Sequence, residues 1–189
     1  MLVPAVMVPS YVVASYVVAS PVAGEGGAHA PVAAAPLLFA VFLVSAAAEE
    51  AGWTAYATDP LRRRLGALGA AVVLGAVWGV WHLVPLAQAG RSPAWTFLGT
   101  VAARVIMVWV YRGSGGNVPS AAVVFHAMLN VVPSLLPGYS ADATVVACAA
   151  LFTTLVAVPL GVRLLREPPC HGSGRARPAP ICGSWRGRR

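Results

Sequence analysis

Five long apolar runs limit what this chain can fold into. Short, polar, turn-rich segments separate them, and each run has about 19 to 26 residues, enough for one helix to cross the roughly 30 Å hydrocarbon core of a bilayer. Strands of a membrane barrel would alternate apolar and polar residues over about ten positions, a pattern that this sequence lacks. We therefore predict an all-α fold, a polytopic transmembrane helical bundle. The apolar runs are residues 32–57, 66–87, 94–112, 118–136 and 142–165.

The composition agrees with a membrane protein of one domain. The 189 residues are 58% hydrophobic and 10% charged, whereas soluble domains carry roughly 25% charged residues. We predict an N-terminal apolar segment and loop at 1–31, a membrane domain at 32–165, and a disordered basic cytoplasmic tail at 166–189. Residues 1–20 are long enough for an additional helix, so the bundle would have five or six spans.

The positions of the arginines orient the predicted bundle. The arginines at 62–64, Arg112, and the pair Arg163 and Arg166 fall at every second boundary between apolar runs. Cytoplasmic loops are enriched in basic residues, so this alternation predicts a multi-pass protein of the cell membrane with both termini in the cytoplasm. The net charge of +7 comes from these loops and from the tail, which favours the lipid bilayer as a partner and predicts no nucleic acid.

Polar residues of types that can take part in catalysis interrupt the apolar runs. A charged side chain in hydrocarbon costs several kcal/mol, so such residues are candidates for a functional site. Glu49 and His82 lie roughly 20 Å and 27 Å along their helices from the arginine loop between them, which places them at similar depth. We therefore expect the three runs that carry these residues to bring them together. The five candidates are Glu49, Glu50, His82, His126 and Asn130.

These residue types suit the hydrolysis of a carbonyl compound. A carboxylate can act as a general base, and a neighbouring His can share in polarising a water. His126 and Asn130 are four residues apart on one helix face, where both can donate hydrogen bonds to a developing oxyanion. Each residue alone has a simpler interpretation, because His and Asn in membrane helices are often interhelical hydrogen-bonders, and a Glu pair can lie among lipid headgroups. Their joint occurrence at compatible depths favours an active site.

Three short motifs surround these residues, namely EEAGWTAY, WGVWH and HAMLN. In this order they resemble the EExxxR, FxxxH and HxxxN motifs of the CPBP family, which contains type II CAAX prenyl endopeptidases and bacteriocin-processing relatives. The resemblance covers roughly residues 40–140. It implies an intramembrane endopeptidase that hydrolyses a peptide bond of a membrane-associated or prenylated protein or peptide substrate.

The resemblance also implies a role for each polar residue. By position, Glu49 would be the catalytic glutamate, His82 its partner in activating water, and His126 and Asn130 the oxyanion hole. We favour this mechanism, for which no cofactor is expected. A zinc site held by Glu49, His82 and His126 is left open as an alternative, since carboxylate and imidazole groups are zinc ligands.

Two residues depart from the family motifs. Trp78 replaces the family's Phe, a mild aromatic exchange, whereas Thr54 replaces its Arg. An Arg at that position could pair along the helix with Glu50, so in this chain Glu50 either needs another partner or remains protonated. Arg104 lies inside an apolar run, and few acids are available to pair with it, so we expect it to pair with Glu50. Glu50, Trp78 and Arg104 are therefore predicted to support the site.

A second function stays open if Arg104 does not compensate in this way. The chain would then be a catalytically inactive relative that acts as a bacteriocin-immunity or partner-binding membrane protein. A transporter is a weaker interpretation, because the sequence lacks two similar halves with Gly/Pro interruptions at mid-membrane.

Overall fold

The computed structural model describes most of the predicted membrane domain. Helices and turns make up the described residues, with no strand among them, which confirms the all-α prediction. The predicted segment at 1–31 and the predicted tail at 166–189 lie almost entirely outside these residues, and so does the proposed helix at 1–20. The described ranges are 30–88, 92–116, 122–136 and 142–166.

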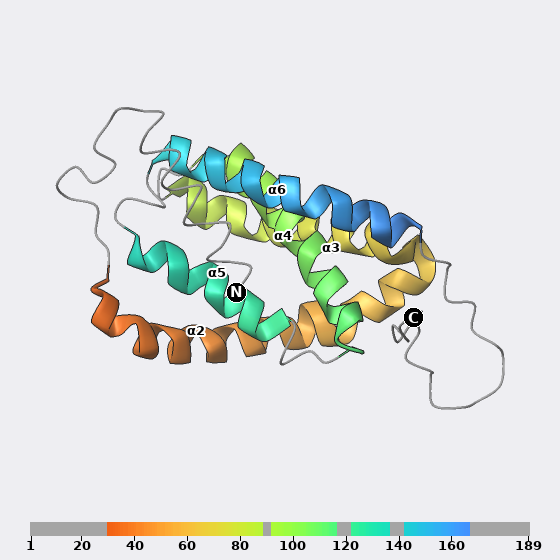
Figure 1. The fold of residues 1–189 in the computed structure, drawn as a ribbon, viewed down its shortest axis with the longest axis horizontal. Helices are drawn as coiled ribbons and strands as arrows, with labels where there is room; N and C mark the ends of the chain where they lie inside the picture. The colour runs from red at the N-terminus through yellow and green to blue at the C-terminus, as the bar shows by residue number, and fades with distance from the viewer. Residues whose placement is uncertain (1–29, 89–91, 117–121, 137–141, 167–189) are drawn as a thin grey trace, which may run out of the picture.

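After the short 3₁₀ turn η1, the helical elements α2, η2 and α3 follow one another without a break. The helix α2 runs directly into the π-helix η2, and η2 runs directly into α3. A sharp kink at Gly66 then folds the rest of α3 back alongside the other helices (Figure 1). Gly66 has φ of 74° and ψ of 174°, a positive-φ conformation that glycine adopts readily. The elements are η1 Val32–Ala34, α2 Ala35–Glu50, η2 Ala51–Thr58, α3 Asp59–Gln88, α4 Pro93–Gly113, α5 Val124–Leu135 and α6 Ala143–Leu165.

The segment at 57–66 corrects one prediction from the sequence. We expected a polar loop in ATDPLRRRLG, but the helix continues through Leu65 and the chain reverses at Gly66. A single residue with positive φ makes the turn, so the polar residues before it stay helical. Pro60 stands next to the junction of η2 and α3, where the backbone hydrogen bonds change from π to α spacing, and it does not end the helix there.

The helices α3, α4 and α6 pack against one another around one core (Figure 1). A glycine allows the close approach of α3 and α4: a Cβ atom added at Gly75 would lie 2.8 Å from the Cα atom of Val101. Trp78, three residues after Gly75 on α3, lies against Arg104 and Met107 of α4. The buried apolar residues of this core are Ala71, Ala102, Val105, Ile106, Val108, Ala157 and Leu164.

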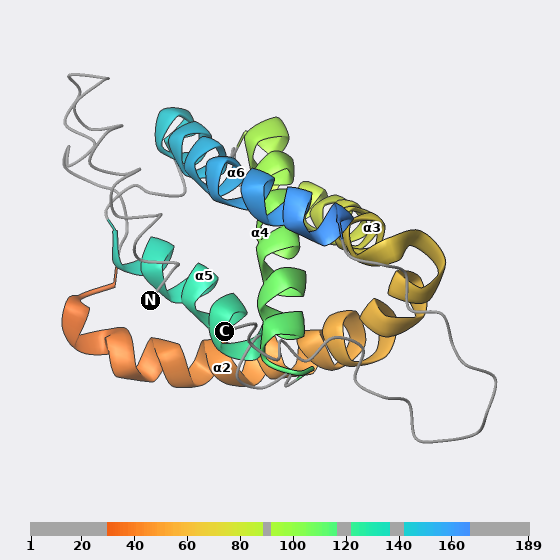
Figure 2. The same ribbon diagram turned by 45° about the vertical axis from the view of Figure 1, so that its right-hand side comes forward.

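The helices α2 and α5 form a second pair, joined through Ala46, Val123 and Ala127. Figure 2 shows α4 running from the side of α6 towards the junction of α2 and η2. The helix α5 is shorter than the predicted run 118–136, because Leu136 is extended and Ala122–Val123 have π spacing. Its 12 residues rise roughly 18 Å, less than the thickness of a hydrocarbon core.

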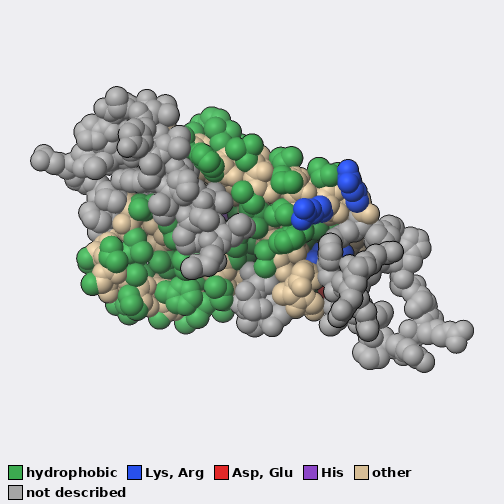
Figure 3. All heavy atoms as spheres, in the orientation of Figure 1, with side chains coloured by type: hydrophobic (Ala, Val, Ile, Leu, Met, Phe, Trp, Pro, Cys, Tyr) green, Lys and Arg blue, Asp and Glu red, His purple; other side chains and the backbone are tan. Residues whose placement is uncertain are grey.

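The described residues have the features of a helical membrane bundle. The stretches Val32–Leu83, Pro93–Gly113 and Ala143–Leu165 are long and apolar enough to cross a membrane, and the first of them turns back at Gly66. Many large apolar side chains, such as Leu37 and Leu155, point outward, where lipid would solvate them. On the face drawn in Figure 3, apolar side chains dominate and arginines gather near the C-terminal end of α6. The number of spans and their orientation stay predictions.

Candidate active site

The adjacent residues Glu49 and Glu50 lie where α2 ends and η2 begins. The π-helix η2 has eight residues, and its wider turn is marked by Thr58, whose hydroxyl donates to the carbonyl oxygen of Trp53, five residues earlier, at 2.9 Å. Such π segments occur often at functional sites, where they redirect side chains. Here the two carboxylates meet different surroundings: Glu49 is half-buried, and Glu50 is 0% exposed.

A cavity of about 520 Å³ lies between the α2–α5 pair and the other three helices. All four predicted catalytic residues line it, with Glu49 on α2, His82 on α3, and His126 and Asn130 on α5. Trp78 lines it as well, next to His82 on α3. The structure therefore brings the predicted residues to one place, and their catalytic roles stay predictions.

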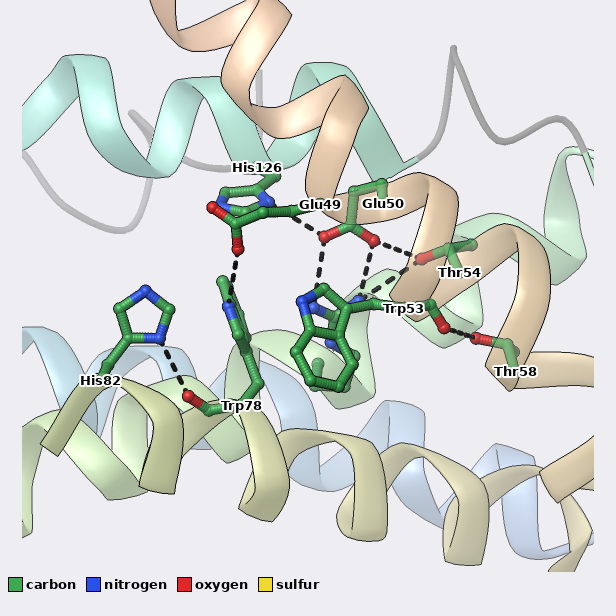
Figure 4. Close-up of polar contacts among 9 residues, drawn as sticks. Glu49, Glu50, Trp53, Thr54, Thr58, Trp78, His82 and His126 are labelled. Atoms are coloured by element: carbon green, nitrogen blue, oxygen red, sulfur yellow. Dashed lines mark hydrogen bonds and ion pairs between the residues drawn. The ribbon is translucent and has the colours of Figure 1, made fainter.

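Glu50 lies outside this cavity in a network of buried polar groups (Figure 4). Arg104 donates from Nη1 to Oε2 of Glu50 at 2.9 Å and from Nη2 to Oε1 at 3.2 Å. The Thr54 hydroxyl donates to Oε2 as well, and Arg104 Nη1 lies 3.3 Å from that hydroxyl oxygen. Arg104 is thus the partner that the sequence analysis expected for Glu50, and it reaches the carboxylate from a different helix.

The two histidines are each fixed through the Nδ1 atom. In His126 this atom lies 2.9 Å from Oε1 of Glu50, and in His82 it lies 2.9 Å from the carbonyl oxygen of Trp78. Ionised carboxylate and carbonyl oxygens only accept hydrogen bonds, so both Nδ1 atoms carry hydrogen. The Nε2 atom of each neutral ring is then an acceptor, and it donates only when the ring becomes an imidazolium.

Trp78 contacts every charged or titratable group of the site except Glu50. Its indole Nε1 donates to Oε2 of Glu49 at 3.2 Å. Its ring makes edge contacts with His82 and His126, at centroid distances of 5.4 Å and 4.9 Å. The guanidinium carbon of Arg104 lies 4.5 Å from the centre of the same ring, a cation–π distance.

A family model described as type II CAAX prenyl endopeptidase Rce1-like matches residues 31–132 of the chain. This chain belongs to the Rce1-like family. A curated relative, CAAX prenyl protease 2 of Methanococcus maripaludis, is 27% identical over 137 residues, which are 66% of this chain and 49% of the relative. The chain therefore spans about half the length of that relative. No solved structure matches the chain.

The matched residues 31–132 include all the motif residues of the Rce1-like domain. Both departures from the family motifs have structural counterparts in it. The hydroxyl of Thr54, which stands at the position of the motif arginine, and the guanidinium of Arg104 both donate to Glu50. The hydrogen bond from Trp78 to Glu49 was missed, because we treated Trp for Phe as a simple aromatic exchange. The indole N–H, which Phe lacks, was the signal that could have found it.

The zinc alternative was checked against the geometry of this Rce1-like site. No three His, Cys, Asp or Glu residues in the described part of the chain group together as a ligand set. Zinc held by Glu49, His82 and His126 stays an untested alternative, and the mechanism proposed for this site uses the side chains alone. The fourth predicted residue, Asn130, lines the cavity, and its backbone carbonyl accepts from the hydroxyl of Ser134 at 2.7 Å.

Proposed function

We propose that this protein is a CAAX-type intramembrane endopeptidase of the cell membrane, in which Glu49 activates the attacking water. One observation carries the proposal. Of the two adjacent carboxylates, only Glu49 borders the cavity, and among the described residues one side-chain hydrogen bond, from Trp78, leaves most of its acceptor sites open to a water. A general base must lie within hydrogen-bond reach of the proton that it removes.

The water loses a proton to Glu49 while its oxygen attacks the carbonyl carbon of the scissile peptide bond. The Nε2 atom of His82 accepts a hydrogen bond from the same water, because the Nδ1–H of His82 is committed to a backbone carbonyl. The tetrahedral intermediate then collapses, the C–N bond breaks, and the protonated Glu49 returns its proton to the leaving amine. The immediate products are one carboxylic acid and one amine, and transfer of the acid proton to the amine gives a carboxylate and an ammonium ion.

The developing oxyanion needs hydrogen-bond donors that line the same cavity as Glu49. The amide of Asn130 can donate directly. His126 donates through Nε2 only when both of its ring nitrogens carry hydrogen, and its Nδ1 atom lies 2.9 Å from the carboxylate of Glu50. The oxyanion role proposed for His126 from the motif therefore depends on Glu50, which in turn is held by Arg104.

The substrate proposed here is a protein or peptide segment at the membrane with a CAAX-type, prenylated C-terminus. Two findings support it: the Rce1-like family match and the printed name of the curated relative. A cavity lined by both polar and apolar side chains suits a peptide that leaves the bilayer core, because an unwound backbone needs hydrogen-bond partners there.

The test uses the full chain in proteoliposomes and an internally quenched, farnesylated CAAX-type peptide. Glu49→Gln keeps the size of the side chain but removes the base, so we expect kcat to fall by about 10²–10⁴-fold. Asp59→Asn is the matched control, since it makes the same acid-to-amide change outside the cavity. A Glu49→Gln protein that cleaves the peptide at the parent rate would rule out the proposal.

The alternative is a catalytically inactive relative that serves as an immunity or partner-binding factor. Its support is Thr54, which stands where the family motif has arginine. The ion pair of Arg104 with Glu50 weakens that support, because the carboxylate has its cation. A binding scaffold should keep its cellular phenotype with Glu49→Gln, whereas an enzyme should lose it.

A further inference from the structure

We propose that Trp78 is a positioning residue that holds Glu49 in its reactive orientation through the indole N–H. This inference rests on the proposed function, because it concerns how the base of that reaction is aimed. The donor atom Nε1 of Trp78 lies 3.2 Å from Oε2 of Glu49. One carboxylate oxygen is thus held by the protein, and the other, Oε1, is left for the water.

The indole ring is itself held in place from several sides. Trp78 is 5% exposed, and it packs with Met107 and Ala122 in a small buried cluster. The rings of His82 and His126 meet it edge-on, and the guanidinium of Arg104 lies against its face. A Trp side chain with contacts on all these sides has little rotational freedom, so its N–H direction is set before substrate binds.

Glu49 has no comparable restraint of its own. Its side chain is half-buried, and the bond from Trp78 is its only hydrogen bond to another side chain among the described residues. A phenylalanine in place of Trp78 would keep the aromatic contacts but would leave both oxygens of Glu49 free to rotate (Figure 4). The difference between these two residues is therefore a single donor, aimed at the proposed base.

The same ring links the two carboxylates of the site. Trp78 donates to Glu49, and its face and edge contact Arg104 and His126, which are the two partners that bracket Glu50. A shift of the ring would therefore disturb both the base and the proposed oxyanion donor. An indole at position 78 is large enough to contact both Arg104 and His126, and unlike phenylalanine it can also donate a hydrogen bond to Glu49.

The first experiment measures cleavage of the farnesylated quenched peptide by Trp78→Phe in proteoliposomes. In Trp78→Phe the hydrogen bond that orients the charged Glu49 is lost. Hydrogen bonds to charged groups are strong, so we expect kcat to fall about ten- to hundredfold while KM stays unchanged. Because Trp78→Phe also removes ring volume, a second protein carries benzothienylalanine at position 78, which keeps the shape of indole but has sulfur in place of N–H. Both proteins should show the same loss. Trp81→Phe, on the exposed side of α3, is the matched control and should keep the parent rate.

The outcomes separate this inference from the proposed function. If the benzothienylalanine protein cleaves like the parent while Glu49→Gln is inactive, the positioning role is wrong and the proposed base stands. If Glu49→Gln is active, the proposed function fails first. A rise in KM alone, with kcat unchanged, would assign Trp78 to substrate binding and overturn the positioning role.

The second experiment requires no activity. Protein with ¹⁵N-labelled indole groups is prepared in detergent micelles, and the Trp78 resonance is assigned as the one that Trp78→Phe removes. Glu49→Ala should shift this indole proton upfield, since it loses its charged acceptor, while the Trp81 resonance stays in place. An unchanged Trp78 resonance in Glu49→Ala would show that the hydrogen bond is absent and would overturn the inference.

Discussion

Glu49 and Glu50 are neighbours in the chain, but they lie in opposite environments. The carboxylate of Glu50 is fully buried and is held by Arg104, His126 and Thr54. The carboxylate of Glu49 borders a cavity, and within the described part of the chain it accepts one side-chain hydrogen bond, from the indole N–H of Trp78. The one-residue step from an α-helix into a π-helix separates a carboxylate that organises its surroundings from one that is available to react.

The comparison shows how a membrane protein can keep a reactive acid in place. A buried charge is tolerated when it is paired and hydrogen-bonded, and removing one partner costs much more than the pair contributes. The network around Glu50 satisfies this condition and ties α2, η2, α4 and α5 together. Glu49 does not need to hold the fold, so its acceptor sites can serve a reaction.

The largest expected difference between the two acids is in stability. Glu50→Gln removes the charge that compensates Arg104, and stranding a buried cation should lower the free energy of unfolding by about 3–5 kcal/mol. Glu49→Gln should change it by less than about 0.5 kcal/mol, since its side chain is half-buried and lightly bonded. Unfolding of both proteins by SDS in mixed micelles measures the difference. Equal losses would mean that both acids hold the fold, and the comparison would fail.

A smaller effect is expected from the other side of the ion pair. Arg104→Ala should lower the free energy of unfolding by about 3 kcal/mol. This is at the low end for a broken buried pair, because the carboxyl group of Glu50 can become neutral by taking up a proton. Adding Thr54→Arg should restore part of the stability and of the peptidase activity, since it supplies a guanidinium from the neighbouring turn of η2. The same SDS titration and the cleavage assay measure both. A silent Arg104→Ala, or a double variant no better than the single one, would contradict the compensation and favour an inactive relative.

The smallest effect concerns the hydroxyl of Thr54. Thr54→Val keeps the shape of the side chain and removes one hydrogen bond from a carboxylate that keeps three other contacts. Hydrogen bonds inside membrane proteins contribute about 0.6 kcal/mol on average, so a loss of that size is expected. The matched control is Thr154→Val, whose hydroxyl bonds only a backbone carbonyl of its own helix. A loss as large as that of Arg104→Ala would mean that Thr54, and not Arg104, is the main partner of Glu50.

Much of this arrangement could be predicted from the sequence because polar residues are so few. The helical membrane fold follows from the apolar runs, and the pairing of Arg104 with Glu50 follows by elimination among six acids. Elimination works here because a charge inside the bilayer cannot be satisfied by water. Helix rise converts sequence distance into length, which predicted a similar depth for Glu49 and His82; the structure places both at one cavity, and their depth in a membrane stays a prediction.

Other features depend on geometry that spacing does not determine. The hydrogen bond from Trp78 to Glu49 depends on the rotamers of both side chains and on how closely α2 approaches α3. The helical course of the segment up to Leu65 was missed because proline and three arginines are typical of a loop. The predicted oxyanion role of His126 did not consider which ring nitrogen is committed, because that depends on the contact with Glu50.

The π-helix η2 makes the spacing of this region intolerant of length changes. An α-helix turns by about 100° per residue, so deleting one residue between Ala51 and Thr58 would rotate everything before the deletion by roughly that angle relative to α3. Glu50 would then face away from Arg104, and Glu49 would leave the cavity, although the composition of the segment would hardly change. The length of η2, as much as the identity of its residues, is therefore part of the site.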